Sequence, residues 1–394
     1  MVKYDAAIIG GGASGIVAAI SAAKNGKRVI ILEKGARLGK KILASGNGRC
    51  NLLNEELNEE FYNEEARALV KSVFSVFGKD DILGFFKRLG LETYSDDGRI
   101  FPVTNQASSV LKVLEMELER LSVPCELSFV VNSISYSAKE FVVKSSDKEI
   151  DCDKVIIACG GSSYPALGSD GKAYRFAHGF GHSVASPVPS AVPLTAKDPL
   201  CHLLQGQRIF ASVKSFSSGK FINEAKGELL FTKYGLSGTA ILDVSDKISI
   251  AINRENKKDV YVIADMVPFM EENELKDELS VRIKRIRKAE ELLTGILPNK
   301  FGPAFKKMLE TRDINNIAAS LKGKRFNVSG TRGWNEAEFT AGGIAVNEVR
   351  EGTLESKLQK GLYFSGEILN VDGKRGGYNL AWAWASGMIA GKTG

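Results

Sequence analysis

The residues of this chain whose types and spacing most suggest chemistry are glycines and one acid near its start. In DAAIIGGGASGIVAAISAAKNGKRVIILEK, residues 5–34, Gly10, Gly12 and Gly15 fall on G-x-G-x-x-G. The first glycine can make a tight turn, the second lets backbone amides approach a pyrophosphate, and the third lets a helix pack closely on a strand. Glu33 follows 23 positions after the first glycine, where its carboxylate could accept hydrogen bonds from both hydroxyls of a ribose. The pattern predicts a site for an adenine dinucleotide.

The elements that must position these residues are a strand, a helix and a second strand. Tyr4–Ile9 is an apolar run of strand length, apolar positions then recur with helical spacing from Ala13 to Asn25, and Arg28–Leu32 is a second apolar run. The helix N-terminus would add the positive end of a dipole. A glycine-rich turn without a ligand is the alternative, and the combination of strand, helix and acid argues against it.

Composition and charge narrow the class of protein. A chain of 394 residues with 44% hydrophobic residues can form two or three domains, and its net charge is only +6. Apolar runs of membrane-spanning length are absent, and Met1 to Lys3 lead directly into the first strand, so we expect neither a membrane span nor a secretory signal. Five cysteines without C-x-x-C indicate a reduced, cytoplasmic protein lacking a redox disulfide of that kind.

The segment GARLGKKILASGNGRCNLLN, residues 35–54, points to the kind of dinucleotide. An NAD-binding domain usually continues with alternating strands and helices, whereas this segment is rich in glycine and small polar residues and is too irregular for a helix or strand. Backbone and short side chains of this kind suit an extended cofactor, which favours FAD. An ordinary surface loop is the alternative, and it would not need so many glycines, asparagines and an arginine together.

Later segments repeat the pattern of a strand followed by glycine. Val155–Ala158 predicts a buried strand that ends at Gly160-Gly161, where a cofactor could lie. Leu362–Ser365 predicts another strand, and Glu367 just after it could bind a ribityl hydroxyl. Glycines before Leu380 open a predicted helix whose first amides could face the N1 and C2 carbonyl edge of a flavin. Two tryptophans in that helix, Trp382 and Trp384, are spaced i and i+2 and are therefore interpreted as packing residues. A further predicted helix is capped by Asn105 or Thr104.

These motifs, together with EFTAGGIAV, resemble the BaiN/YhiN-type family of FAD-dependent oxidoreductases, also called aminoacetone oxidase-like FAD-binding proteins. The resemblance covers nearly the whole chain. Asn47 departs from it, since a glycine is more common at that position, and this affects the expected backbone path. Non-covalent FAD would be held by three groups of residues. The ADP half would contact Gly10, Gly12, Ala13, Ser14, Gly15, Glu33 and Lys34; the pyrophosphate and flavin would contact Gly39, Lys40, Ser45, Asn47, Arg49, Cys50 and Asn51; the ribityl chain and ring would contact Gly366, Glu367, Gly377, Tyr378, Asn379 and Leu380. The strand that ends at Ala158, Gly160 and Gly161 resembles the second nucleotide-contacting strand of such flavoproteins, so the cofactor would also lie against its end.

The expected fold class is α/β, with a Rossmann-like FAD-binding domain of the two-dinucleotide flavoprotein type. This domain would be discontinuous, formed by residues 1–190 and 337–394. Short strand-like runs predict a small β-barrel-like or sandwich part of the insertion at 191–267, and 268–336 is predicted to be helical. Residues 271–325 carry 13 Lys and Arg against 9 Asp and Glu. A solvated helix face explains this excess, and a surface for RNA or an acidic partner is the alternative.

The expected chemistry is hydride transfer at the flavin N5. A second G-x-G-x-x-G after a strand is absent, so NAD(P)H is only a possible electron donor; the three histidines lack metal-ligand spacing, and the sequence lacks a serine hydrolase elbow. Arg49 and Tyr164 are the candidates for anchoring or protonating a small carbonyl, enone or amine substrate, in a cleft between flavin and insertion. Reductase and oxidase both stay open, with a reductase favoured. A flavin-bearing RNA-modifying or regulatory protein is the alternative.

Overall fold

The computed structural model describes residues 3–394. The chain divides into two compact units. Unit 1 comprises Met1–Pro187 and Phe339–Gly394, and unit 2 is Val188–Glu338. Each unit has its own hydrophobic core. Strands β10 (Val184–Ser190) and β17 (Phe339–Ile344) pair with each other where the chain passes between the units.

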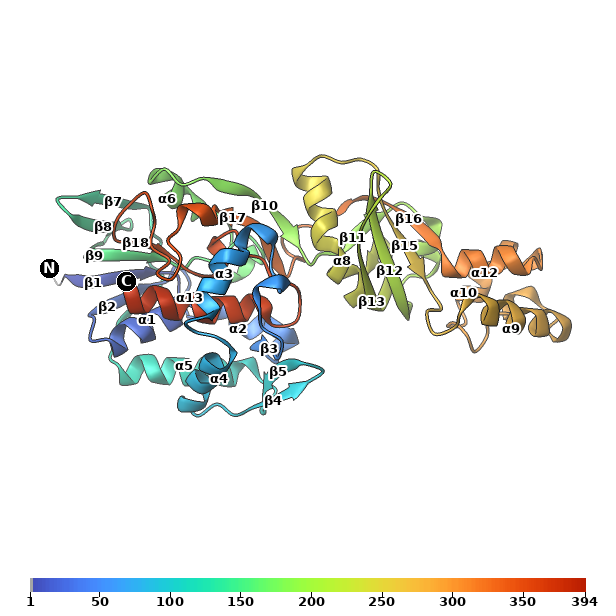
Figure 1. Cartoon of the computed structure of the whole chain (residues 1–394), viewed down its shortest axis with the longest axis horizontal. Helices are drawn as coiled ribbons and strands as arrows, with labels where there is room; N and C mark the ends of the chain where they lie inside the picture. The colour runs from blue at the N-terminus through green and yellow to red at the C-terminus, as the bar shows by residue number, and fades with distance from the viewer. Residues whose placement is uncertain (1–2) are drawn as a thin grey trace. The chain divides into compact units, whose positions relative to one another are not determined.

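Unit 1 is built on a seven-stranded sheet whose centre is parallel (Figure 1). β1 (Tyr4–Ile9) lies between β2 (Val29–Leu32) and β9 (Glu149–Ile157), and β18 (Leu362–Phe364) pairs with β9. All four run in the same direction, so their carboxyl ends meet at one edge of the sheet. Ligands of open α/β sheets bind at such an edge. The remaining strands are β6 (Cys125–Glu126), β7 (Ser133–Ser137) and β8 (Glu140–Lys144).

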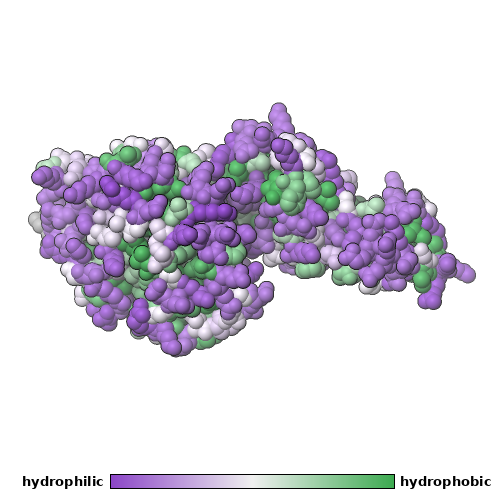
Figure 2. All heavy atoms as spheres, viewed as in Figure 1, coloured by the Kyte–Doolittle hydropathy of each residue, from purple (hydrophilic) through white to green (hydrophobic). Residues whose placement is uncertain are grey.

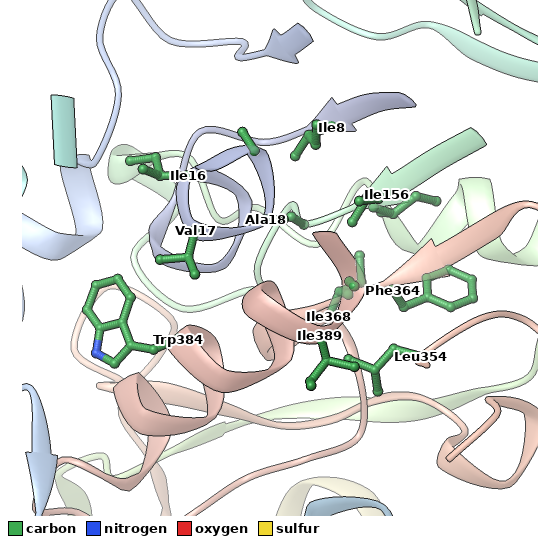
Figure 3. Packing of buried hydrophobic residues seen from close by; sticks show 14 of the residues in the cluster. Ile8, Ile16, Val17, Ala18, Ile156, Leu354, Phe364, Ile368, Trp384 and Ile389 are labelled. Carbon is green, nitrogen blue, oxygen red and sulfur yellow. The ribbon is translucent and has the colours of Figure 1, made fainter. Parts of the chain in front are cut away.

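Two helices pack closely because small residues face each other. α1 (Ala13–Lys24) and the last helix, α13 (Tyr378–Thr393), lie against one another in unit 1. A Cβ on Gly387 or on Gly391 would come within 2.3 Å or 2.1 Å of a carbonyl oxygen of α1, so neither position accepts a side chain. Apolar side chains from α1, α13 and the sheet, among them Ile8, Ile156 and Trp384, meet in the core between them (Figure 3).

Several boundaries differ from the sequence predictions. The segment expected to be irregular contains α2 (Lys40–Ala44), a 3₁₀ turn at Ser45–Gly48 and β3 (Leu53–Asn54). The cap predicted at Asn105 or Thr104 is wrong, because Gln106 is the N-cap residue of the helix Ala107–Arg120. The other elements of unit 1 are α3 (Arg67–Phe74), α4 (Lys79–Arg88), β4 (Thr93–Asp96), β5 (Arg99–Pro102), α5 (Ala107–Arg120) and α6 (Tyr174–Gly179).

Unit 2 contains a closed six-stranded barrel. Its order is β11-β14-β13-β12-β15-β16, which covers Leu194–Ala196, Gly235–Ser237, Lys220–Thr232, Arg208–Ser217, Val260–Asp265 and Lys324–Thr331. The predicted division of the insertion at residue 267 is therefore wrong at one point: β16 belongs to the barrel. It pairs antiparallel with β15 and buries Phe326 in the core, so the helices between these strands are an excursion from the barrel.

Most helices of unit 2 lie in the segment between β15 and β16. They are α9 (Glu272–Arg285), α10 (Phe301–Ala304), α11 (Lys306–Glu310) and α12 (Ile314–Lys322), while α7 (Pro199–Leu203) and α8 (Thr239–Ser249) come earlier. Over α9 and α12, the face drawn in Figure 2 is mainly hydrophilic. Within residues 3–394, no helix combines the length and apolar character that crossing a membrane requires.

Candidate functional site

The turn between β1 and α1 shows three different uses of glycine. Gly10 has φ +107°, and a Cβ on it would lie 2.5 Å from the carbonyl oxygen of Ala158. A Cβ on Gly15 would lie 1.9 Å from the carbonyl oxygen of Gly10, so this glycine lets α1 approach the strand. At Gly12, by contrast, a Cβ would meet nothing within 4 Å. Gly12 is the N-cap of α1 and supplies no side chain to cap it, so the first amides of the helix have no side-chain partner at their N-cap and the space beside Gly12 is open. This is a suitable position for an anion.

Glu33, at the end of β2, is tied to the glycine turns. Its two carboxylate oxygens accept hydrogen bonds from the amides of Gly11 and Gly35, both at 2.7 Å. Each oxygen keeps a further lone pair with which to accept a ribose hydroxyl. Two further contacts hold the loop that follows Glu33. Lys34 forms an ion pair with Asp170 at 3.0 Å, and the Gly39 amide donates a hydrogen bond to the Gly11 carbonyl. A Cβ on Gly35 would lie 3.2 Å from the Lys40 ammonium.

The segment from Ser45 to Asn51 turns tightly with unusual backbone angles. Gly46, Asn47 and Cys50 have φ of 56°, 54° and 60°, in the left-handed region. Asn47 thus adopts a conformation that glycine accepts best and asparagine tolerates. Asparagine in place of the glycine more common at this position is therefore compatible with the turn. The Cys50 thiol is fully buried, and burial raises its pKa to about 12, so it is a protonated thiol at neutral pH. It is not a nucleophile in this state.

Glu367 is the centre of a polar cluster formed by four separate segments. It follows β18 and accepts hydrogen bonds from the Lys41 ammonium at 2.5 Å, the Ser163 hydroxyl at 3.1 Å and the Thr340 amide at 2.9 Å. Burial by itself would raise the pKa of Glu367, but the Lys41 charge and these hydrogen bonds outweigh it and hold the pKa below its ordinary value. We call Lys41, Ser163, Thr340 and Glu367 the Glu367 cluster. It places an ionised pair next to the carboxyl ends of β9 and β18.

Three buried polar atoms of unit 1 lack a hydrogen-bond partner. Among the described residues these are Asn51 Oδ1, the Tyr174 hydroxyl and Ser365 Oγ. Ser365 directly follows β18, Asn51 follows the tight turn described above, and the charge of Glu367 raises the pKa of Tyr174 further after burial has raised it. Buried polar groups are rarely left unpaired in folded proteins. Together with the open space at Gly12, these atoms fit an extended polar cofactor that borders several segments of unit 1.

Comparison with known proteins agrees with this geometry. The sequence model of a family described as "HI0933-like protein Rossmann domain" matches residues 4–393. The chain belongs to this HI0933-like family. This is the BaiN/YhiN-type family of FAD-dependent oxidoreductases, and the predicted family and Rossmann-type FAD-binding fold are confirmed.

Two relatives of the HI0933-like chain carry names that describe a reaction. A "3-dehydro-bile acid delta(4,6)-reductase" of Clostridium scindens is 39% identical, with 98% of each chain covered. A "Ribosomal RNA dihydrouridine synthase" of Escherichia coli is 32% identical, with 98% of this chain and 96% of the relative covered. Among solved structures, a 3-ketosteroid delta1-dehydrogenase from Sterolibacterium denitrificans matches with a TM-score of 0.51 at 15% identity, covering 99% of both chains. That likeness concerns the fold alone.

The structure brings many of the predicted cofactor residues of this HI0933-like protein together. Ser14, in the first turn of α1, donates to the Ser365 carbonyl, and a Cβ on Gly366 would lie 2.5 Å from the Ser14 hydroxyl. Gly160 and Gly161 follow β9, and the Gly161 amide lies 3.4 Å from a Glu367 oxygen. The predicted acid after the last strand is thus beside the predicted glycines after β9, as parallel pairing requires.

At the start of α13, the side chains contact protein. The helix begins at Tyr378, two residues before the predicted Leu380, with Gly377 at φ 105° as N-cap. The Tyr378 ring stacks on Phe61, and the Asn379 amide exchanges hydrogen bonds with Gly373. The Tyr378 and Asn379 side chains are thus engaged by the protein itself. Both tryptophans of α13 are buried, as predicted, and donate to backbone carbonyls.

The two predicted substrate residues lie in different surroundings. The Arg49 guanidinium lies 4.3 Å from the Phe101 ring centroid and 3.8 Å from Asp96, and its side chain is 44% exposed. Tyr164 follows Ser163 of the Glu367 cluster and has a left-handed backbone, φ 57°. The predicted site residues did not include Lys41, Ser163, Thr340 and Tyr174. Lys41 and Thr340 do lie within quoted motifs, LGKKILASGNGRCN and EFTAGGIAV, and could have been noticed there.

One of the two histidines interpreted as structural, His182, has a structural environment in this family member. His182 is buried, and its ring nitrogens lie 3.1 Å from a Glu348 oxygen and 2.7 Å from the Ser356 hydroxyl. His178 is exposed. Among residues 3–394, no three His, Cys, Asp or Glu side chains are grouped as metal ligands would be.

Proposed function

We propose that this protein binds FAD and reduces a carbon–carbon double bond that is conjugated with a carbonyl group in a small molecule. The observation that carries the proposal is the open N-terminus of α1 at Gly12, bordered by Glu33 and by the carboxyl ends of β9 and β18. Family membership supports the cofactor. The names of both relatives denote saturation of a ring double bond beside a carbonyl, which supports the reaction.

Residues of unit 1 would hold the cofactor by charge and hydrogen bonding. The α1 amides would bind the pyrophosphate, and Glu33 would accept from the adenosine ribose while keeping its bonds to Gly11 and Gly35. Glu367 would accept from the ribityl chain, and Lys41 keeps that carboxylate ionised. Asn51 Oδ1, Ser365 Oγ and the Tyr174 hydroxyl would gain the partners that they lack. When bound, FAD supplies hydride transfer at N5.

Substrate binding would rest on Arg49 and Tyr164. Arg49 can donate to a carbonyl oxygen, and Tyr164, adjacent to the Glu367 cluster, can donate a proton. Since the sequence lacks a second dinucleotide motif, NADH or NADPH would reach the flavin through the substrate site and would compete with substrate. We therefore expect slow flavin reduction by at least one of them and ping-pong turnover.

Anaerobic half-reactions test the proposal. Purified protein should release FAD on acid denaturation, lose its flavin absorbance with NADH or NADPH, and regain it with a 3-oxo-Δ4 steroid. Arg49→Ala and Tyr164→Phe should slow reoxidation by the steroid much more than they reduce FAD content. Release of FMN or NAD instead of FAD would overturn the cofactor assignment. Reduction by an amine, with oxygen as acceptor, would replace the reductase by an oxidase.

A second candidate function is reduction of uridine in RNA. The relative named as a ribosomal RNA dihydrouridine synthase, at 32% identity over almost the whole chain, favours it, as does the basic excess of residues 271–325. Two of these basic side chains are already used within the protein. Arg282 donates hydrogen bonds to Glu278 and to two backbone carbonyls, and Arg312 donates to carbonyls at the end of α9. Incubating the enzyme with NADPH and ribosomal RNA, then measuring dihydrouridine by mass spectrometry, separates the candidates. Dihydrouridine formation without steroid turnover would favour the second.

A further inference from the structure

A row of aromatic side chains crosses three adjacent strands of the barrel in unit 2. Phe221 on β13 is paired with Phe216 on β12, which is paired with Tyr261 on β15. The first two rings meet edge to face with centroids 5.8 Å apart, and the second two stack at 5.0 Å with planes 7° apart. On β16, the guanidinium of Arg325 lies 3.5 Å from the centroid of the Tyr261 ring. We call these four residues the aromatic row.

The aromatic row faces away from the barrel interior. On β15, the neighbours of Tyr261 are Val260 and Val262, both buried in the core of unit 2. On β16, Phe326 next to Arg325 is buried in the same core. Because successive side chains of a strand point to opposite faces, Tyr261 and Arg325 lie on the outer surface.

The two ends of the aromatic row are open to solvent. Phe221 is 58% exposed, and the Arg325 side chain is 51% exposed. In the middle, Tyr261 is covered by Phe216 and Arg325. Aromatic pairs across strands stabilise a sheet by burying each other, but that role gives no reason for an exposed ring at one end and an exposed guanidinium plane at the other.

Charge favours a polyanionic ligand for this surface. The strands β12, β13, β15 and β16 together carry six Lys and Arg against three Asp and Glu. Asp259, just before β15, lies 3.4 Å from the Arg325 guanidinium and reduces the excess to two. Two of the lysines adjoin the aromatic row. Lys220 precedes Phe221, and Lys214, two residues before Phe216, has a side chain that is 52% exposed and lies 3.9 Å from Glu224.

We propose that the aromatic row binds single-stranded RNA. One base would stack on Phe221 and another on the Arg325 guanidinium, about 14 Å away across three strand spacings, with phosphates near Lys214 and Lys220. Stacking on rings and guanidinium planes tolerates any base, so the surface would bind RNA without reading its sequence. This proposal extends the second candidate function. It is tested without any reductant, so its failure is distinguishable from failure of the flavin chemistry.

Fluorescence anisotropy with a labelled oligouridylate of about 12 nucleotides tests the surface on the full-length protein. Phe221→Ala should weaken binding at least about fivefold, which is the lower end of the effect of losing one stacked base. Arg325→Gln should also weaken binding and lower the slope of log affinity against log salt by about 0.7, if the charge is next to one phosphate.

Phe210→Ala is the matched control, because Phe210 is also 58% exposed and lies on β12, six residues before Phe216. Its RNA affinity should be unchanged. If Phe221→Ala fails to fold, Arg325→Gln gives the same comparison. Equal losses for Phe210→Ala and Phe221→Ala, or no binding by the unmodified protein at low salt, would overturn the proposal. A dimer that Phe221→Ala converts to monomer would overturn it too, because the aromatic row would then contact a second copy of this chain.

Discussion

At the scale of single residues, Glu367 shows how a buried charge is kept ionised. Its carboxylate is surrounded by the Lys41 ammonium, the Ser163 hydroxyl and the Thr340 amide, and its side chain is only 18% exposed. These donors together overcome the cost of burial, which alone would raise its pKa. A residue supported in this way can accept hydrogen bonds from a ligand without being neutralised.

Replacing Glu367 tests this account. Glu367→Gln leaves the Lys41 ammonium beside a neutral amide, so we expect a loss of about 1–3 kcal/mol in the free energy of unfolding at neutral pH, measured with denaturant. Glu149→Gln is the matched control, since Glu149 pairs with Lys144 at the same 2.5 Å with both side chains nearly half exposed. That change should have little effect. Equal losses for the two variants would contradict the role given to burial.

Lowering the pH should remove the difference in stability between the unmodified protein and Glu367→Gln. Because the pKa of Glu367 is lower in the folded protein than in the unfolded chain, the unfolded chain takes up the proton first as pH falls. The stabilisation is therefore complete above the ordinary glutamate pKa and disappears as pH falls through the folded value. Unfolding midpoints of the unmodified protein and Glu367→Gln should begin to converge as pH falls below the ordinary glutamate pKa of about 4.3. A gap that stays constant down to pH 3 would contradict the shifted pKa.

Glu33 should affect the cofactor more than the fold. Glu33→Ala removes the proposed ribose contact and two amide contacts, so FAD affinity should fall about tenfold or more, as expected for charge-assisted hydrogen bonds worth about 1.5–3 kcal/mol. The measurement is FAD titration of cofactor-free protein by flavin fluorescence. Thermal unfolding of both proteins without FAD serves as control for loosening of the glycine turns. An unchanged dissociation constant would leave Glu33 a purely structural residue.

At the scale of elements, the junction of β1 and α1 separates packing from binding. Gly15 is needed so that the helix can lie against the preceding turn, whereas a Cβ on Gly12 would meet nothing within 4 Å. Both glycines belong to one motif, yet only one of them restricts the fold.

Alanine substitutions should separate these two roles. Gly15→Ala places a Cβ 1.9 Å from the Gly10 carbonyl oxygen, so the turn must shift, and we expect low yield or a loss of more than about 2 kcal/mol in stability. Gly12→Ala should fold normally and bind FAD more weakly, because its methyl group occupies the space left for the cofactor. Circular dichroism melting and FAD titration measure the two effects. A stable Gly15→Ala protein would contradict the packing role.

At the scale of the whole molecule, the chain has two cores and one proposed cofactor site. All residues proposed to contact FAD lie in unit 1, while the barrel and its helices have a separate core in unit 2. A ligand that binds only the folded form raises the stability of the part that holds it.

Calorimetry should therefore show an uneven effect of FAD. Removing the cofactor should lower the unfolding temperature of unit 1. The corresponding loss in its free energy of unfolding is about 2.7 kcal/mol, compared with protein in FAD at a hundred times the dissociation constant. Phe326→Ala, in the core of unit 2, identifies the other transition, because deleting a buried phenylalanine costs about 3–5 kcal/mol. FAD should leave that transition in place. Equal shifts of both transitions on adding FAD would contradict a cofactor site confined to unit 1.

The sequence by itself determined the parts that depend on neighbours in the chain. Gly10, Gly12 and Gly15 with Glu33 fixed the strand–helix–strand unit, because turn geometry, helix spacing and strand length are local properties. The family and fold class followed from such motifs. Only the tertiary structure decided that Lys41, Ser163, Thr340 and Glu367 meet, and that β16 closes the barrel beyond the helices. Lys41 and Glu367 are separated by 326 positions, and their contact depends on the parallel pairing of β1, β9 and β18, which no local pattern specifies.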